Sequence, residues 1–257
     1  MTTSPTHDPL RRPWRSRFAH RHPRAYLAAH VAGGTLAVVV LTWIFLFIAD
    51  EIPEPSALVG VDRFVSAWME SHGTEPGERI LHAVSYLGAP GLFAIVVVVV
   101  AWLSWRRDWL AASALVATTA SGMFLDSVLK FVFHRGRPET AIEFIRRASW
   151  SFPSGHAMNS MIGYGFLTVL LLEHVRDARR RAAIVIAAAL LIGVIGFSRL
   201  YLGVHYLSDV TGGWLAGGAW LIVCASGYRF ARARLTLQGF SGVARTESHT
   251  ASAGLGR

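Results

Sequence analysis

His205 and Asp209 are two ionisable residues four positions apart in a strongly apolar part of the chain. On a helix this spacing places both side chains on one face. The carboxylate can then accept a hydrogen bond from one imidazole nitrogen, which fixes the tautomer and leaves the other nitrogen free to attack. Because histidine can serve as a covalent nucleophile, the pair predicts nucleophilic chemistry at His205.

A second histidine follows a helix-starting sequence. Pro153, Ser154, Gly155 and His156 are typical of a tight turn that opens a helix. A helix N-terminus offers free backbone N–H groups and the positive end of the helix dipole to an anion. We therefore expect an anion to bind beside His156, which would be placed to protonate a leaving oxygen as a general acid.

Three cations complete the set of candidate site residues: Lys130, Arg137 and Arg199. Divalent metals prefer carboxylates or neutral imidazoles and are repelled by neighbouring cations, so this set argues against a metal site. Clustered Lys and Arg suit a phosphate-like anion, and they would neutralise the oxygens of a phosphoryl group during its transfer. The residues therefore predict phosphoryl transfer without a metal or other cofactor.

The composition indicates the environment of these residues. The chain has 257 residues, of which 53% are hydrophobic and 16% charged, and its mean hydropathy is +0.40. A soluble domain has about 25% charged residues, so a soluble globular enzyme is excluded. The single cysteine, Cys224, excludes an intramolecular disulfide and a cysteine-based metal site. The net charge of +9 is expected of cytoplasmic loops in a membrane protein, and no nucleic-acid-binding motif is present.

The apolar residues are grouped in blocks long enough to cross a bilayer. They predict an all-α, polytopic membrane protein with a transmembrane domain over residues 26–228 and disordered cytoplasmic tails at 1–25 and 229–257. The expected six transmembrane helices cover about 26–49, 88–105, 109–133, 156–174, 182–198 and 205–227.

The distribution of basic residues predicts the orientation. With both termini in the cytoplasm, the inner segments hold 17 of the 25 Lys and Arg residues. The candidate site residues then share the outer face of the plasma or inner membrane, because they lie at the end of the third helix, the start of the fourth, the end of the fifth and the start of the sixth.

The outer segment between the first two spans contains an amphipathic stretch at 61–70. Its pattern predicts a helix lying in the membrane interface, and a cap packed on the bundle is an equal alternative. The apolar side would carry Val61, Phe64, Val65, Trp68 and Met69, and the polar side Asp62, Arg63, Ser66 and Glu70.

Other ionisable residues receive structural interpretations. Asp126 is four residues before Lys130 and is expected to pair with it, which would orient the lysine without contact between Asp126 and substrate. The remaining groups are interpreted as loop charges, namely Arg135, Arg146 and Arg147, or as interfacial histidines, namely His82, His134 and His174.

Three motifs resemble those of the type 2 phosphatidic acid phosphatase family. Residues 130–138 are similar to its K-x6-R-P signature, 153–156 to its P-S-G-H signature and 198–209 to its S-R-x5-H-x3-D signature. The resemblance covers roughly residues 60–228. The family uses no metal and includes soluble vanadate-dependent haloperoxidases, but the transmembrane helices here favour its lipid phosphatases.

The resemblance assigns a role to each matched position. It implies that His205 is the phosphorylated nucleophile, Asp209 its partner and His156 the general acid. It also implies that phosphate is bound by Lys130, Arg137, Ser154, Gly155 and Arg199.

The predicted function is hydrolysis of a membrane lipid phosphate or isoprenyl diphosphate, such as phosphatidate, phosphatidylglycerophosphate or undecaprenyl diphosphate. A lipid phosphotransferase would use the same phosphohistidine. A serine hydrolase using Ser154, His205 and Asp209 would have no use for three cations. A transporter of anions or lipid phosphates would need polar groups at both faces, whereas the candidate residues gather at one.

Overall fold

The computed structural model describes residues 23–53, 55–141 and 149–254, with side chains described between residues 31 and 235. Within these ranges the chain forms helices and no strand, as the sequence predicts. In chain order the helices are α2 (Pro23–Glu51), α3 (Ala57–His72), α4 (Glu75–Tyr86), α5 (Pro90–Trp105), α6 (Trp109–Phe133), α8 (Gly155–His174), α9 (Ala178–Tyr201) and α10 (Leu207–Gly254).

Six stretches are long and apolar enough to cross a membrane, and they confirm the six predicted spans. The second stretch is longer than predicted because α4 precedes α5 within it. The stretches are Val31–Glu51, Glu75–Trp105, Trp109–Phe133, Gly155–His174, Ala178–Tyr201 and Leu207–Leu235.

The predicted tails are only partly described. Residues 1–22 and the loop charges Arg146 and Arg147 lie outside the described residues. Helix α10 does not end at residue 228, where the sequence places the end of the transmembrane domain, but continues to Gly254. Arg232 contacts Asp108 and Glu173, so α10 still packs on the bundle beyond residue 228.

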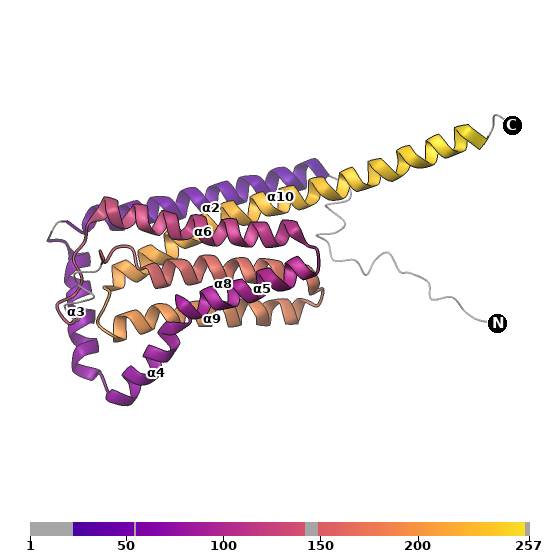
Figure 1. Cartoon of the computed structure of the whole chain (residues 1–257). Helices are drawn as coiled ribbons and strands as arrows, with labels where there is room; N and C mark the ends of the chain where they lie inside the picture. Colours follow the sequence, from indigo (N-terminus) through magenta and orange to yellow (C-terminus); the bar gives the residue numbers. More distant parts are fainter. Residues whose placement is uncertain (1–22, 54, 142–148, 255–257) are drawn as a thin grey trace, which may run out of the picture.

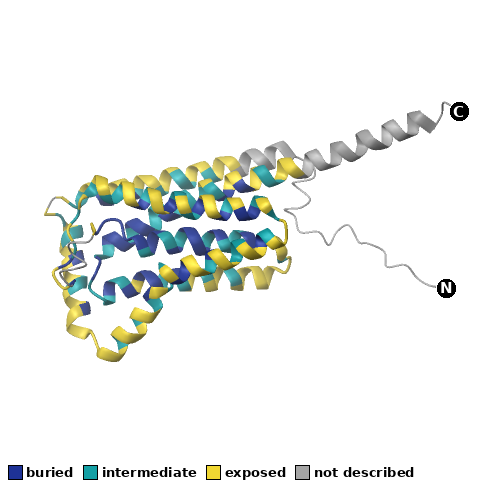
Figure 2. Ribbon diagram, in the orientation of Figure 1, coloured by how far each residue is buried: buried dark blue, intermediate teal, exposed yellow. Residues whose placement is uncertain are grey.

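Helix α8 is the central helix of the bundle. It packs against α6, α9 and α10 (Figure 1). Half of the residues in its most apolar stretch are buried, whereas at most 28% are buried in the corresponding stretch of any other span (Figure 2). The peripheral helices instead expose large apolar side chains such as Phe93, Phe124 and Phe131, as expected of surfaces that face lipid. The start of α8, which carries the P-S-G-H sequence, is therefore enclosed by other helices.

Two glycines let α10 approach α8 at this point. A Cβ atom added to Gly213 would lie 2.7 Å from the carbonyl oxygen of Ser154, and one added to Gly217 would lie 2.8 Å from that of Met158. Small residues spaced four apart allow such close backbone contact between membrane helices. The approach holds the first turn of α10 against the first turn of α8, and the N–H of Ser154 donates to the carbonyl oxygen of Asp209 at 2.9 Å.

Helix α3 lies across one end of the bundle, where it contacts α2, α9 and α10 (Figure 1). Phe64 on its predicted apolar side is 70% exposed, whereas Met69 is buried against Leu200 and Val210. The predicted polar side is wrong at Asp62, which is only 1% exposed. Helix α3 thus packs on the bundle along one side and leaves an apolar side uncovered, which combines the two expected arrangements.

Candidate active site

The structure brings the sequence-predicted site residues together at one end of the bundle. The end of α6, the start of α8, the end of α9 and the start of α10 meet there, next to α3 at the left end of the bundle in Figure 1. The start of α2, the α5–α6 turn and the α8–α9 connection lie at the opposite end. The predicted grouping depended on the alternation of helix directions, which Figure 1 shows.

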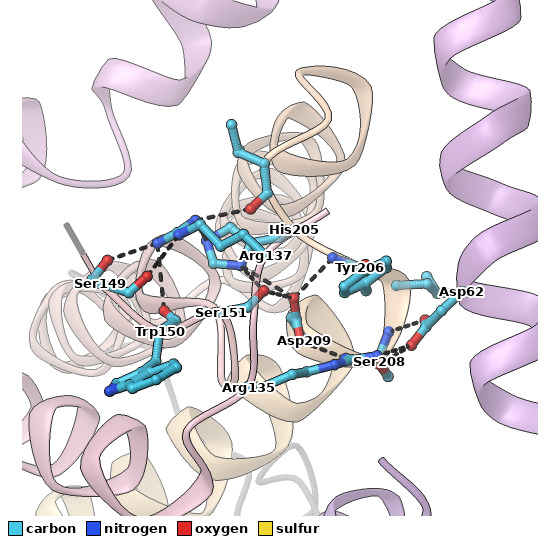
Figure 3. Close-up of polar contacts among 12 residues, drawn as sticks. Asp62, Arg135, Arg137, Ser149, Trp150, Ser151, His205, Tyr206, Ser208 and Asp209 are labelled. Atoms are coloured by element: carbon cyan, nitrogen blue, oxygen red, sulfur yellow. Dashed lines mark hydrogen bonds and ion pairs between the residues drawn. The ribbon is translucent and has the colours of Figure 1, made fainter. Parts of the chain in front are cut away.

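His205 is buried in the loop just before α10 and has polar neighbours at both ring nitrogens (Figure 3). Its Nε2 atom is 3.1 Å from Nη1 of Arg137, and its Nδ1 atom is 3.4 Å from Oδ2 of Asp209. A guanidinium can only donate, so Nε2 is the acceptor and Nδ1 carries the proton. Arg137 and Asp209 therefore favour the same tautomer, with the lone pair on Nε2.

Arg137 is held by main-chain and side-chain acceptors on two loops. Its Nη1 atom donates to the carbonyl oxygen of Val204 at 2.8 Å, and its Nε atom donates to that of Ser149 at 3.0 Å. Its Nη2 atom also donates to Oγ of Ser149 at 2.9 Å. These bonds keep the cation beside the Nε2 atom of His205.

Lys130 lies close to the turn that opens α8. Its Nζ atom contacts Oδ2 of Asp126 at 2.8 Å, which confirms the predicted pairing of these two residues. A Cβ atom added to Gly155 would lie 2.7 Å from Nζ and 2.9 Å from that carboxylate oxygen. Any larger residue at position 155 would displace the ammonium group, so glycine is required for this close approach.

Several buried polar atoms around this turn lack hydrogen-bond partners. Within the described side chains, four such atoms exist, and three of them belong to Asp126, Ser154 and Arg199: Oδ1, Oγ and Nε respectively. Arg199 is anchored through Nη1, which donates to Oγ of Ser85 on α4. A free hydroxyl and a free guanidinium N–H are donors that a bound anion can satisfy.

His156 is on the first turn of α8, within electrostatic reach of Lys130, Arg137, Arg199 and His205. The α4–α5 junction packs on it, because a Cβ atom added to Gly88 would lie 3.0 Å from Cδ2 of its ring. Among the described side chains, no cluster of His, Cys, Asp and Glu is arranged to hold a metal ion.

Sequence reasoning missed a set of residues behind Asp209. Arg135, interpreted as a loop charge, is 9% exposed and donates from Nη1 to Oδ1 of Asp209 at 2.6 Å. Its Nη2 atom donates to Oδ2 of Asp62 at 2.7 Å. Asp209 also accepts from Oγ of Ser151 and, at 2.8 Å, from the N–H of Tyr206. The sequence offered one signal for Arg135, which is its position two residues before the predicted phosphate ligand Arg137. It offered none for Asp62, because Asp62 is distant along the chain from the other site residues.

The loop residues of the site have shifted pKa values. Burial lowers the pKa of His205 to about 4, with Asp209 opposing the shift and Arg137 and Arg199 adding to it. His205 is therefore neutral at physiological pH, as a nucleophile must be. Burial alone would lower the pKa of Arg135, but Asp209 and Asp62 raise it above its usual value.

Comparison with known proteins identifies the family. A sequence model described as the PAP2 superfamily matches residues 111–233, which include every predicted site residue. Phosphatidylglycerophosphatase B of Bacillus subtilis (strain 168) is 30% identical over 141 residues, which are 54% of this chain and 69% of that protein. The chain belongs to the PAP2 superfamily.

The fold of this PAP2 protein also matches a solved structure. A crystal structure of a transmembrane PAP2-type phosphatidylglycerolphosphate phosphatase from Bacillus subtilis has a TM-score of 0.69 and 26% identity, covering 76% of this chain and 96% of that one. The crystal structure of Aquifex aeolicus LpxE has a TM-score of 0.46 and 23% identity, covering 68% of this chain and 96% of that one. The family and the Bacillus subtilis structure together show that the chain is a multi-pass membrane phosphatase of the PAP2 type.

Proposed function

We propose that this PAP2 protein removes the phosphate of a membrane lipid phosphate or isoprenyl diphosphate, without a metal, through a phosphohistidine formed on His205. The observation that carries the proposal is the combination of a neutral, oriented imidazole with unsatisfied donors beside it. The Nε2 lone pair lies next to Arg137, and the free donors of Ser154 and Arg199 line the neighbouring turn.

The phosphate is bound by the start of α8 and the three cations. The free N–H groups of the first turn of α8, at and after Gly155, and the hydroxyl of Ser154 donate to its oxygens. Lys130, Arg137 and Arg199 neutralise the negative charge that is spread over the three equatorial oxygens of the phosphoryl group during its transfer. When the phosphate binds, Arg137 donates its Nη1 hydrogen bond to a phosphate oxygen in place of Nε2 of His205. The Nε2 lone pair is then free to react.

In the first step, Nε2 of His205 attacks phosphorus and the bond from phosphorus to the lipid oxygen breaks. His156 gives its proton to that leaving oxygen, so the lipid product departs as an alcohol or as a lipid monophosphate. Asp209 accepts the Nδ1–H hydrogen bond and stabilises the positive charge that develops on the ring.

In the second step, water attacks the phosphohistidine. His156, now neutral, takes a proton from that water, and the bond between phosphorus and Nε2 breaks. Inorganic phosphate leaves and His205 regains its lone pair. If an alcohol replaced water as the acceptor, the same intermediate would support phosphotransfer.

Among lipid substrates, we favour phosphatidylglycerophosphate. The support is the similarity to phosphatidylglycerophosphatase B, at 30% identity over 69% of that protein. Phosphatidate and undecaprenyl diphosphate present the same terminal phosphate to the cations and are the alternatives that a substrate panel must include.

The site faces the outside of the plasma or inner membrane, with both termini in the cytoplasm. The support is that 17 of the 25 basic residues lie in the segments that the sequence predicts to be cytoplasmic. Two of these segments within the described residues, the α5–α6 turn and the α8–α9 connection, lie at the end of the bundle opposite the site. A C-terminal tag should therefore resist external protease in sealed, right-side-out cells, and its cleavage would reverse this orientation.

The decisive experiment measures phosphate release by the purified protein in detergent with excess EDTA. The panel contains the three lipids and a soluble monoester, with His205→Ala as the negative control and the exposed His82→Ala as the matched histidine control. We expect EDTA-resistant release that only His205→Ala abolishes. More than a tenth of wild-type activity in His205→Ala, or release that EDTA abolishes, would refute the mechanism.

A further inference from the structure

Asp62 on α3 is a buried carboxylate that lies outside the matched PAP2 segment, residues 111–233. Its Oδ2 atom contacts Nη2 of Arg135 at 2.7 Å and accepts from Oγ of Ser208. Its Oδ1 atom accepts from the N–H of Ser208 at 2.9 Å. Figure 3 shows α3 presenting Asp62 to the first turn of α10, behind Asp209.

Arg135 joins this carboxylate to the one beside His205. One terminal nitrogen of its planar guanidinium binds Asp209, and the other binds Asp62. The guanidinium also stacks at 4.3 Å over the ring of Tyr206. Because the guanidinium fork is rigid and stacked, a carboxylate on one side fixes how the other nitrogen meets Asp209.

The charges of these three residues matter as much as their geometry. Asp62, Arg135 and Asp209 together carry one net negative charge, with side chains that are 1%, 9% and 0% exposed. Without Asp62, the positive charge of Arg135 would be directed at Asp209 alone. Asp209 would then stabilise positive charge on His205 less well, because interactions between buried charges are weakly screened.

Docking of α3 does not account for a buried charge at this position. Met69, on the same side of α3, already packs against Leu200 and Val210. Buried ion pairs often contribute no more stability than apolar residues of similar size, because removing the charges from water is costly. A carboxylate in this place therefore needs an explanation beyond the attachment of α3.

We propose that Asp62 and Arg135 are positioning residues for the catalytic pair: Asp62 holds Arg135 so that Asp209 stays both oriented and negatively charged toward His205. The inference rests on the proposed role of His205 as the nucleophile. It makes α3 a functional part of the site through the contact of Asp62 with Arg135.

The test compares Asp62→Asn with two control variants on the same helix. Glu70→Gln removes the same charge from an exposed position. Met69→Ala loosens the packing of α3 and leaves the contacts between Asp62, Arg135 and Asp209 in place. For each purified full-length variant we would measure kcat and KM, the inhibition constant of inorganic phosphate and the thermal midpoint.

For Asp62→Asn we expect kcat to fall about tenfold or more, as is typical when one member of a coupled charged network is removed. KM and the inhibition constant of phosphate should stay within about twofold, since the anion-binding cations are untouched. Asp62→Glu should recover part of kcat, and Arg135→Lys, which keeps the charge but loses the fork, should share the defect. Glu70→Gln should match the wild type, and Met69→Ala should lower the thermal midpoint with little loss of kcat.

Two outcomes would overturn the inference. One is wild-type kcat in Asp62→Asn, and the other is a kcat loss that Met69→Ala reproduces at the same loss of thermal stability. If either occurs while His205→Ala is inactive, the positioning role fails and the proposed function stands. If His205→Ala retains activity, both fail, because Asp62 is proposed to act through that histidine.

Discussion

Two arginine–carboxylate networks join helices at opposite ends of the bundle. At the site end, Arg135 bridges Asp62 and Asp209 with side chains that are at most 9% exposed. At the other end, Arg232 binds both oxygens of Asp108 at 2.7 and 2.6 Å and Glu173 at 3.3 Å, with side chains 25–35% exposed. The two networks use the same chemistry but differ in how much water reaches them.

They differ also in what remains unsatisfied nearby. The site end keeps buried polar atoms without partners on Asp126, Ser154 and Arg199. At the other end, Asp108 accepts from the N–H of Ala111 as well, and Glu173 accepts from Tyr228 at 2.9 Å. Leaving a buried donor unsatisfied costs stability, so such atoms are expected where a ligand satisfies them. Free donors, more than ion pairs, distinguish a binding site from a structural connection.

The largest expected effect tests that distinction at Arg199. Arg199→Met removes a cation whose Nε atom has no partner. We expect kcat/KM to fall by at least about 10³-fold, the scale of a transition-state arginine in phosphoryl transfer. The thermal midpoint should change little, because the loss of the unsatisfied Nε donor offsets the loss of the hydrogen bond from Nη1 to Ser85. Activity within tenfold of wild type in the phosphate-release assay would contradict the assignment.

The second effect concerns His156 and the leaving oxygen. His156→Gln should reduce turnover of lipid phosphates by about 10²- to 10⁴-fold, the range for a lost general acid. An aryl phosphate with an acidic leaving group should lose much less, since its oxygen departs without a proton. The measurement is kcat across substrates of graded leaving-group pKa. Equal losses across the series would exclude the general-acid role.

A smaller effect is the pH dependence of wild-type activity. The burial-lowered pKa of His205, about 4, keeps the imidazole neutral down to that pH. As pH falls through about 4, protonation removes the lone pair, so kcat/KM should fall there and not near 6.5, the usual value for histidine. We would measure kcat/KM from pH 3.5 to 7.5 and correct for the titrated ionisation of the substrate phosphate. A fall in kcat/KM as the pH is lowered through about 6.5 that survives this correction would contradict the prediction.

The smallest effect is expected at the opposite network. Arg232→Gln should leave kcat within about twofold and lower stability by roughly 0.5–1 kcal/mol, as for a partly exposed ion pair. The hydrogen bond from Arg232 lowers the pKa of Asp108, so its contribution is complete above the usual carboxyl value of 3.8 and is lost as pH falls through the lowered pKa. Thermal midpoints of wild type and variant should therefore differ at pH 7 and converge in strong acid. A tenfold loss of kcat would mean that the two networks are coupled.

The sequence was sufficient for the spans and for the grouping of His156, Arg199 and His205. A bilayer imposes a length on each apolar helix, and alternating helix directions then determine which ends share a face. The spacing of four between Lys130 and Asp126 was likewise sufficient for their ion pair, because a helix places such residues side by side. These conclusions depend on local periodicity and on the membrane, and both are readable along the chain.

Only the tertiary structure decided what lies behind Asp209. Asp62 belongs to the polar side of an isolated amphipathic helix, and nothing in its neighbours along the chain predicts burial. Its environment is set by two distant segments: α10, which approaches α8 closely at Gly213 and brings Ser208 to Asp62, and the segment after α6, which brings Arg135 there. The energy of a buried charge depends on partners distant in sequence, whereas helix formation and membrane crossing depend on local pattern, so packing alone could assign Asp62 and Arg135 to the site.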